Sequence, residues 1–361
     1  MRVDEAVERC YDMGGTDVHT VIDQTLHIRI QGTLHKQDEI ITQAEFDEFC
    51  QENGVTLYPD RATDVSLVLA GVTCRLNIYW ERGRRGIAIR LLSNKIPELD
   101  DQHLPDQFRH FLGEKNGMIL VTGTVGSGKT TALTALLNEI NKTRKCVILT
   151  VEDPIEYKHP NKEALFIQRE VGSDVPSYHA AIMDALRQDI NVVLVGEMRE
   201  MDTIEAALTL AETGHLVLGT VHTKTLPEAI ERMAGAWPTE ARDLIVGRIA
   251  SVFKGGLHMR LLKTIDGGRV AFPHVMVVDN KIRNAIEQRK YSTVEDLMVA
   301  DPHCYSDVES ATDLIKGGRV KPMDVLGFLS KDNQEYVCQR CNLDYDELVA
   351  QHEEELRNLG K

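Results

Sequence analysis

The clearest pattern in the chain is a series of short apolar runs that alternate with amphipathic stretches from Gly117 onward. Each run has the length of a buried strand, and they occupy residues 118–121, 146–151, 192–195 and 216–221. Between the last two runs, apolar side chains recur at the i, i+3, i+4 and i+7 positions of one helix face, at Ile204, Ala207, Leu208 and Ala211. Strands that alternate with helices favour a mostly parallel α/β sheet.

The first hundred residues carry the pattern of a separate, smaller α/β domain. Residues 26–31 alternate apolar and polar side chains before Gly32, as a half-buried strand does. Residues 72–80 and 86–92 flank a charged turn like the two strands of a hairpin, whereas helical periodicity is weak in this part. The stretch 94–107, which holds two prolines and several acids, breaks both periods and predicts a linker.

These patterns divide the chain into four parts. We expect an N-terminal domain over residues 1–97, a linker over 98–112, a larger α/β domain over 113–270 and a more helical region over 271–361. A length of 361 residues allows each domain to bury a proper core.

Composition narrows the class of protein. The 7 cysteines are odd in number and scattered, and there is no apolar N-terminal segment, so we expect a reduced, cytosolic protein. No apolar run approaches the roughly 20 residues that span a bilayer, so any membrane link would go through a partner. A net charge of −15 opposes nucleic-acid binding, because phosphate backbones are bound by an excess of Lys and Arg.

The first apolar run leads into the motif G-x-x-x-x-G-K-T, which is typical of a loop that cradles nucleotide phosphates. Its glycines permit turns in which backbone N–H groups converge at the start of the helix predicted over 130–141. Lys129 would reach the β- and γ-phosphates of ATP, and Thr130 would bind Mg²⁺. The flanking strand and helix disfavour a glycine-rich turn that binds nothing. We assign nucleotide binding to Gly123, Gly126, Ser127, Gly128, Lys129, Thr130 and Thr131.

Polar residues also follow the other apolar runs, where an open α/β sheet binds its ligands. Residues 152–156 read Glu-Asp-Pro-Ile-Glu, and Gly196 and Glu197 follow the third run. Glu156 and Glu197 both qualify as the base for an attacking water, and spacing alone does not separate them. His215 and His222 bracket the fourth run. Their spacing leaves their role open, because seven residues apart they point to opposite faces of a regular strand.

Five ordered motifs make the chain resemble a known family. They are Glu152-Asp-Pro-Ile-Glu-Tyr-Lys-His, Gln168-Arg-Glu-Val-Gly, Ala185-Leu-Arg-Gln-Asp, Val195-Gly-Glu-Met-Arg and Ala211-Glu-Thr-Gly-His-Leu-Val-Leu-Gly-Thr-Val-His-Thr. The motifs closely resemble those of the secretion ATPase superfamily, and within it the chain is similar to the type IV pilus retraction ATPases of twitching motility. Residues 16–19 and 28–32 resemble their PAS-like N-terminal domain, and residues 281–286 resemble a C-terminal motif of retraction enzymes.

The resemblance implies a RecA-like phosphate-loop ATPase core and specific roles in hydrolysis. Glu156, in the motif called the Asp box, would be the general base, and Glu197 would be the Walker B acid that organises metal and water. His222 would sense the γ-phosphate, with His215 nearby in the His box.

Two arginines of the first domain match family positions that approach the nucleotide. Arg75 and Arg90 would act like arginine fingers, because a planar cation that moves in with its domain neutralises charge only when the site closes. The alternative for both is an ordinary exposed strand residue.

The resemblance also implies a homohexameric ring whose sequential ATP hydrolysis turns a pilus platform protein of the inner membrane, so that pilin subunits are drawn back. We expect a cytoplasmic protein, peripherally attached to that membrane through the pilus machinery. The chain departs from the family at 124–125, at 189–191 and at Lys281, none of which is a hydrolytic residue.

Three rival functions are weighed against this one. Assembly and secretion ATPases carry two zinc-binding C-x-x-C pairs, whereas this chain has one, Cys338 and Cys341, for which we expect free thiols rather than zinc. A nucleotide-binding scaffold without turnover is disfavoured by the intact Lys129, Glu156 and Glu197. A nucleic-acid translocase is disfavoured by the acidic charge.

Overall fold

The computed structural model describes residues 1–30, 32–92, 95–124 and 126–359. Gln31, Asn94 and Val125, which entered the sequence interpretation, lie outside the described residues. The chain divides into two compact units, the first formed by Met1–Ile96 with Glu156–Lys158 and the second by Pro97–Ile155 with His159–Lys361. The two units are described separately.

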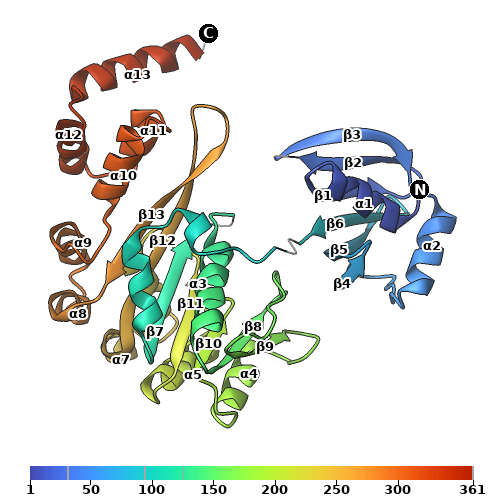
Figure 1. Cartoon of the computed structure of the whole chain (residues 1–361), viewed down its shortest axis with the longest axis horizontal. Coiled ribbons are helices and arrows are strands. Elements are labelled where there is room, and N and C mark those ends of the chain that lie inside the picture. The colour runs from blue at the N-terminus through green and yellow to red at the C-terminus, as the bar shows by residue number, and fades with distance from the viewer. Residues whose placement is uncertain (31, 93–94, 125, 360–361) are drawn as a thin grey trace. The chain divides into compact units, whose positions relative to one another are not determined.

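The first unit is a small α+β domain with one antiparallel sheet in the order β3-β2-β1-β6-β5-β4 (Figure 1). Its elements are α1 (Val3–Asp12), β1 (Gly15–Val21), β2 (Thr25–Ile30), β3 (Thr33–Ile40), α2 (Gln43–Glu52), β4 (Thr63–Leu69), β5 (Val72–Glu81) and β6 (Arg84–Leu91). The predicted hairpin is confirmed as β5 and β6. Alternate side chains of β5 are buried, namely Cys74, Leu76 and Ile78. The face of β5 opposite these buried residues carries mainly polar side chains.

The helices of this unit were not evident from periodicity, and capping explains part of their stability. α2 begins after Thr42, whose hydroxyl accepts a hydrogen bond from the Glu45 amide, while the Thr42 amide donates to the Glu45 carboxylate. Such a reciprocal capping box satisfies two backbone donors at a helix start.

The second unit is built on a seven-stranded sheet in the order β13-β12-β7-β11-β10-β8-β9. Its strands are β7 (Gly117–Gly123), β8 (Val147–Glu152), β9 (Leu165–Glu170), β10 (Val192–Val195), β11 (Leu216–Val221), β12 (Phe253–Lys263) and β13 (Arg269–Val277). All are parallel except β13, which pairs antiparallel with β12. The predicted α/β fold and its four apolar strands are therefore confirmed, whereas β9 and the β12–β13 hairpin were not predicted.

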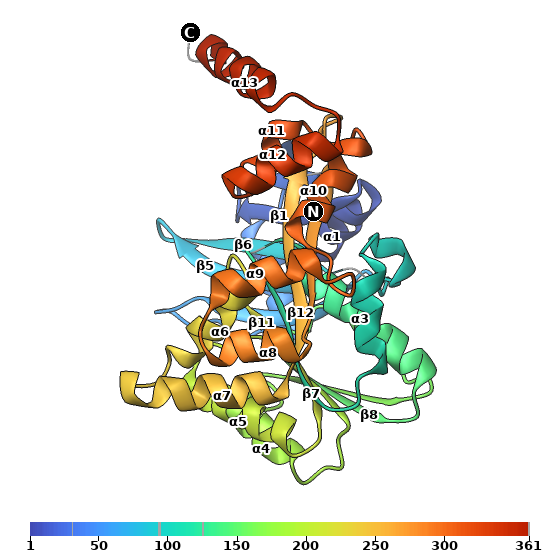
Figure 2. The same ribbon diagram turned by 90° about the vertical axis from the view of Figure 1, so that its left-hand side faces the viewer.

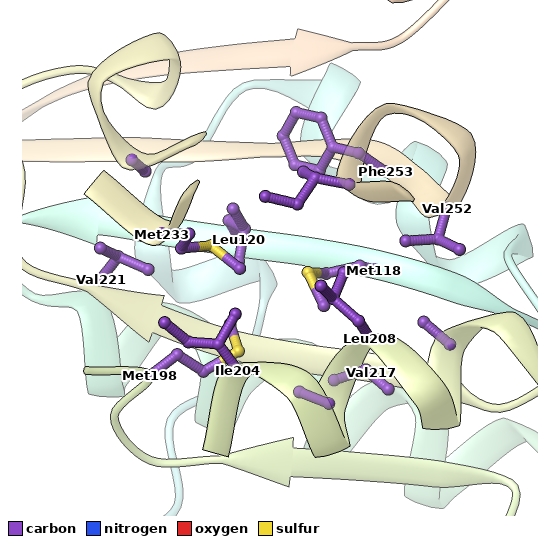
Figure 3. Packing of buried hydrophobic residues seen from close by; sticks show 14 of the residues in the cluster. Met118, Leu120, Met198, Ile204, Leu208, Val217, Val221, Met233, Val252 and Phe253 are labelled. Atoms are coloured by element: carbon purple, nitrogen blue, oxygen red, sulfur yellow. The ribbon is translucent and has the colours of Figure 1, made fainter. Parts of the chain in front are cut away.

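Helices cover both faces of this sheet, as its parallel strands require. They are η2 (Asp106–Gly113) and α3 (Lys129–Thr143) on one face, and α4 (Tyr178–Ala185), α5 (Met201–Glu212), α6 (Leu226–Ala234) and α7 (Arg242–Val252) on the other, with η1 (Asp100–Gln102) and η3 (Thr239–Ala241) between elements. Neighbouring side chains of β7 alternate between the two cores. Ile119 packs on the α3 face, while Met118 and Leu120 pack beside Leu208 and Phe253 on the other (Figure 3).

The segment expected to be a linker is packed into the second unit instead. Residues 98–112 include η1 and most of η2, and Leu99, Phe108 and Phe111 are buried in the core beneath α3. The rings of Phe108 and Phe111 meet edge to face, with centroids 5.8 Å apart. A short 3₁₀ helix places residues i and i+3 on the same side, which gives too brief a pattern to stand out among prolines and acids.

The C-terminal region contains α8 (Asn280–Glu287), α9 (Tyr291–Ala300), α10 (Asp307–Lys316), α11 (Pro322–Leu326), α12 (Lys331–Arg340) and α13 (Tyr345–Leu359). Its helical part thus begins after β13 rather than at residue 271. α10 to α12 pack beside the β12–β13 hairpin through Phe272, Val308 and Val325 (Figure 2). Cys338 is buried in this cluster, and neither it nor Cys341 forms a disulfide among the described residues. Among the described helices, none is both long and apolar enough to cross a membrane.

Candidate functional site

The glycine-rich loop after β7 has the geometry of a phosphate cradle. Gly123, Gly126 and Gly128 all have positive φ angles, of 144°, 74° and 93°, and Gly128 is the N-cap of α3. A Cβ on Gly123 would lie 2.2 Å from the Met259 carbonyl oxygen of β12, so only glycine fits between these strands. The loop therefore ends at a helix start, where the first N–H groups have no partner within the helix and attract anions.

Ser127 adds an available hydroxyl to this loop. Its side chain is 2% exposed, and among the described residues its Oγ has no hydrogen-bond partner. A buried polar group without a partner is costly unless a ligand or water completes it, so this hydroxyl points to a polar ligand at the loop.

Lys129 is the centre of the site. Its Nζ donates to the carbonyl oxygens of Gly123 and Thr124 at 2.9 and 2.8 Å, and it lies 3.3 Å from His222 Nδ1. An ammonium group can only donate, so Nδ1 of this imidazole is the acceptor. The other ring nitrogen, Nε2, then faces Glu197 Oε1 at 3.9 Å. The structure thus brings together Lys129, His222 and Glu197 from the ends of three neighbouring strands.

Local contacts hold Glu197 and His222 in these places. The Thr220 hydroxyl donates to the Gly196 carbonyl, and the Met198 amide donates to the Thr220 carbonyl at 3.0 Å. The peptide groups on both sides of Glu197 are therefore fastened to β11. Arg232 of α6 donates to the His222 carbonyl at 2.8 Å, a contact that sequence spacing did not reveal.

The structure does not bring His215 to this site, so its catalytic role stays a prediction. It precedes β11, and its carbonyl accepts from Gly117 at the beginning of β7, so it lies at the amino edge of the sheet. Its Nδ1 contacts the Leu210 carbonyl at 3.0 Å. Seven residues of strand separate it from His222 by about 23 Å.

Glu156, Arg75 and Arg90 fall in the first unit, so their geometry toward the loop is not defined and their roles stay predictions. Glu156 is exposed. Arg75 on β5 and Arg90 on β6 are direct cross-strand partners, and Arg90 also donates to Asp17 at 2.9 Å. Like charges directly opposite one another are destabilising, so this pair is suited to share an anion.

A buried histidine behind the loop was missed by the sequence interpretation. His258 Nδ1 lies 2.9 Å from the Thr122 hydroxyl, one residue before the loop. Burial lowers the pKa of His258 to about 4, and the charges of Arg260 and Lys129 act in the same direction. The imidazole is therefore neutral at physiological pH. No local pattern connects residues 136 positions apart.

A cavity of about 810 Å³ opens beside the loop within the second unit. Its lining includes Gly128 and Thr131 from the loop and first turn of α3, Met259 and Pro273 from the β12–β13 hairpin, and Asp313 and Arg319 from the C-terminal region. Its mixed apolar and charged wall, adjoining a phosphate cradle, is suited to a nucleoside.

A mostly parallel α/β sheet with this loop, and with an acid and a histidine beside its lysine, defines a phosphate-loop nucleotide-binding protein. The family model for Type II/IV secretion system protein matches residues 65–241. The type IV pilus retraction ATPase PilT of Pseudomonas aeruginosa is 32% identical over 317 residues, which cover 82% of this chain and 89% of that protein. The chain belongs to this family of secretion and pilus ATPases, and it is an ATP-hydrolysing enzyme.

Solved structures agree with this assignment. The crystal structure of the pilus retraction motor PilT with bound ADP matches with a TM-score of 0.83 at 32% identity and covers 93% of this chain and 98% of that chain. The Legionella pneumophila ATPase DotB matches with a TM-score of 0.75 at 22% identity, covering 93% of this chain and 95% of its own. The second likeness concerns the fold alone.

Proposed function

We propose that this protein is a hexameric motor that uses ATP hydrolysis to retract type IV pili. The observation that carries the chemical part is the contact of Lys129, His222 and Glu197 at one edge of the sheet. The likeness to a pilus retraction ATPase along most of both chains supports the direction of the work.

The positions of the cavity and of Lys129 define the direction in which the nucleotide would lie along the loop. Thr131 and Gly128 belong both to the α3 start and to the cavity, so the base and ribose would occupy the cavity, and the phosphate chain would run toward Lys129. The γ-phosphate would then meet His222, whose link to Lys129 lets it respond to the charge there. Phosphoryl transfer needs positioning and charge neutralisation more than covalent chemistry, which this arrangement provides.

The available ligands also fit Mg²⁺. The Thr130 hydroxyl and the Glu197 carboxylate are hard oxygen donors of the kind that this ion prefers, and we assign them to hold it, Glu197 partly through water. The bound ion would neutralise charge on the β- and γ-phosphates. Glu197 is 41% exposed and faces the site from the end of β10, so its carboxylate is free to accept water as well as metal.

The remaining roles follow the family. Glu156 would take the proton of the attacking water, and Arg75 and Arg90 would approach the phosphates to stabilise transition-state charge. In a ring of six copies these groups would complete the site as it closes. The ring would act in the cytoplasm on a pilus platform protein in the inner membrane, and we expect no contact with nucleic acid.

Two measurements test this proposal. Purified full-length protein should hydrolyse ATP slowly and only with Mg²⁺, whereas binding without turnover would indicate a scaffold. Deletion of the gene in the source organism should leave surplus surface pili and abolish twitching. Cells without pili would instead identify an assembly ATPase, and normal pili with failed protein secretion would identify a secretion ATPase.

A further inference from the structure

One wall of the cavity beside the phosphate loop is formed by α10 and the residues just before it. Tyr305, Ser310 and Asp313 all line the cavity at this wall. Ser310 and Asp313 are three positions apart on α10, a spacing that places two side chains on the same helix face. Tyr305 is held in place by two backbone hydrogen bonds of 2.8 Å with Val275 of β13. The C-terminal region therefore gives polar groups to the site of the proposed nucleoside.

The Asp313 carboxylate has one of its two oxygens occupied. The Tyr305 hydroxyl donates to Asp313 Oδ2 at 2.7 Å. Burial, followed by this carboxylate, raises the pKa of the Tyr305 phenol, and the Ser310 hydroxyl has a smaller, opposite effect. The phenol therefore keeps its proton at neutral pH and is the donor of the pair. Among the described residues no hydrogen bond or ion pair is made to Oδ1, so this oxygen is available to a ligand in the cavity.

A buried hydroxyl on the same wall also points to a polar ligand. Ser310 is 1% exposed, and among the described residues its Oγ has no hydrogen-bond partner of normal geometry. A buried polar group without a partner is costly unless a ligand or water completes it. The Ser310 hydroxyl and the free Asp313 oxygen together indicate a ligand that carries hydrogen-bonding groups at this wall.

Adenine suits a wall that presents a single acceptor. Its N6 amine donates, whereas guanine carries at the same position the O6 carbonyl, which only accepts. A carboxylate binds guanine when both of its oxygens accept, one from N1–H and the other from the N2 amine. In Asp313 the Tyr305 hydroxyl already occupies Oδ2, so this two-point contact is blocked. The remaining oxygen matches the amine of adenine and repels O6 of guanine.

We propose that Asp313 selects adenine, because its Oδ1 accepts a hydrogen bond from the N6 amine, and that Tyr305 is the positioning residue that keeps Oδ2 occupied. The inference rests on the proposed function, with the nucleoside of ATP in this cavity. The base is the part of ATP that lies furthest from the phosphates, so it would reach the α10 wall when the phosphates lie at the loop. The Ser310 hydroxyl, which can donate or accept, would find its missing partner on the same nucleoside.

Steady-state kinetics of the full-length protein with ATP, GTP and ITP test this selection. The kcat/KM of wild type for ATP should exceed the values for GTP and ITP at least about tenfold, the scale of one hydrogen bond to a charged group. Asp313→Asn should bring these ratios close to one, because an amide can offer its oxygen to adenine or its N–H to O6. Asp324→Asn makes the same change at an exposed position of α11 outside the cavity wall, so this control should keep the wild-type ratios.

Tyr305→Phe tests the positioning role separately. The change frees Oδ2 but keeps the ring and the carboxylate, so the two-point contact with guanine becomes possible. The kcat/KM for GTP should therefore rise relative to that for ATP, and ITP, which lacks the N2 amine, should gain less. The kcat at saturating ATP and the unfolding temperature should stay close to wild type, because the phosphate loop is untouched. A merely structural role of Tyr305 would instead lower kcat/KM equally for all three nucleotides.

The outcomes distinguish this inference from the proposed function. Equal use of ATP and GTP by wild type, a preference for GTP, or unchanged ratios in Asp313→Asn would overturn the selection while leaving hydrolysis at the site intact. An equal loss for all three nucleotides in Asp313→Asn, with a lower unfolding temperature, would also overturn it. Nucleotide binding without turnover in wild type would overturn the proposed function. Displacement of a fluorescent ADP analogue by ADP, GDP and IDP would then still decide the selection.

Discussion

Lys129 Nζ and His222 Nδ1 are 3.3 Å apart although 93 positions separate them in the chain. The contact exists because β7 and β11 are adjacent parallel strands, whose carboxyl ends deliver the loop lysine and the histidine to the same edge. Through His222, the lysine is connected to Glu197 at the end of the next strand.

Lys129→Ala and Glu197→Gln should both abolish hydrolysis but differ in binding. Lys129 provides the cation for the phosphates, so its loss should weaken ATP binding as well as turnover. Glu197→Gln keeps the shape and removes the charge, so it should bind ATP and lower kcat at least about 100-fold. Steady-state kinetics and titration with a fluorescent ATP analogue separate the two. Glu200→Gln, at an exposed position three residues further on, is the control and should retain wild-type kinetics.

His222→Ala and His215→Ala should have unequal effects on kcat. His222 faces Lys129 and Glu197, and we expect its replacement to lower kcat about tenfold or more with little loss of stability. His215 binds the Leu210 carbonyl at the opposite edge, so His215→Ala should cost about 1 kcal/mol of unfolding free energy and leave kcat in the remaining folded protein near wild type. Equal losses of kcat would contradict the separation of the two histidines.

Arg75→Gln should reduce ATPase activity without destabilising the first unit. Arg75 and Arg90 are direct cross-strand partners of like charge, so removing one relieves repulsion and should raise the unfolding free energy by a few tenths of a kcal/mol. Activity should fall because the arginine is proposed to act on the phosphates. Arg84→Gln, at the exposed first residue of β6 in the same hairpin, serves as the comparison. A destabilised variant with full activity would refute this role.

Stability should decrease as the solution becomes acidic, because buried imidazoles must take up protons when the protein unfolds. Burial lowers the pKa of His258 and of His159 to about 4, with smaller effects from Arg260 and Lys129 on the first and from Lys162 on the second. In the unfolded chain each of these histidines has its ordinary pKa of about 6.5. Between about pH 6.5 and about pH 4 the unfolded state therefore binds more protons than the folded state. The contribution of each histidine to the free energy of unfolding is fully present above about pH 6.5. It decreases by up to about 3 kcal/mol per histidine as the pH falls to about 4.

Urea unfolding at about pH 7.5 and about pH 5 measures this loss. His258→Gln should show a smaller drop between the two conditions than wild type, because one buried titrating group is gone. His303→Gln, whose side chain is 76% exposed, should keep the wild-type drop. An unchanged pH dependence in His258→Gln would contradict the assigned pKa.

Phe111→Ala should destabilise the second unit by about 3–5 kcal/mol, the usual cost of deleting a fully buried aromatic ring. Phe111 is 0% exposed and packs close to Gly255 of β12. Asp106→Ala, in the same 3₁₀ helix but with a 99% exposed side chain, should have little effect. Thermal unfolding of the two variants distinguishes a packed segment from a linker, and equal stability would favour the linker.

Much of the second unit could be predicted because its signals are local. β7, the loop and α3 follow from an apolar run, three glycines at fixed positions and a helix start, all within fifteen consecutive residues. β10 and β11 are short runs buried on both faces, so their sequences are almost entirely apolar. Glu197 and His222 were candidates because each follows such a run.

Other features have no local signal. β9 and β12 are interrupted by polar or glycine residues and were not recognised, and the two helices of the first unit have only short apolar faces. The pairing of His258 with Thr122 depends on β12 lying beside β7, which no spacing in the chain encodes.

By itself the sequence determined that the chain binds a nucleotide phosphate. The glycines of one loop between a strand and a helix permit the backbone conformations that phosphate binding requires. The sequence also determined the family, because its five motifs occur in the order that is typical of secretion and pilus ATPases. Only the tertiary structure decided which distant side chains share the site. A strand has two ends, and the order of strands in the sheet, set by packing between residues far apart in the chain, places His222 and Glu197 beside Lys129 and leaves His215 at the opposite edge.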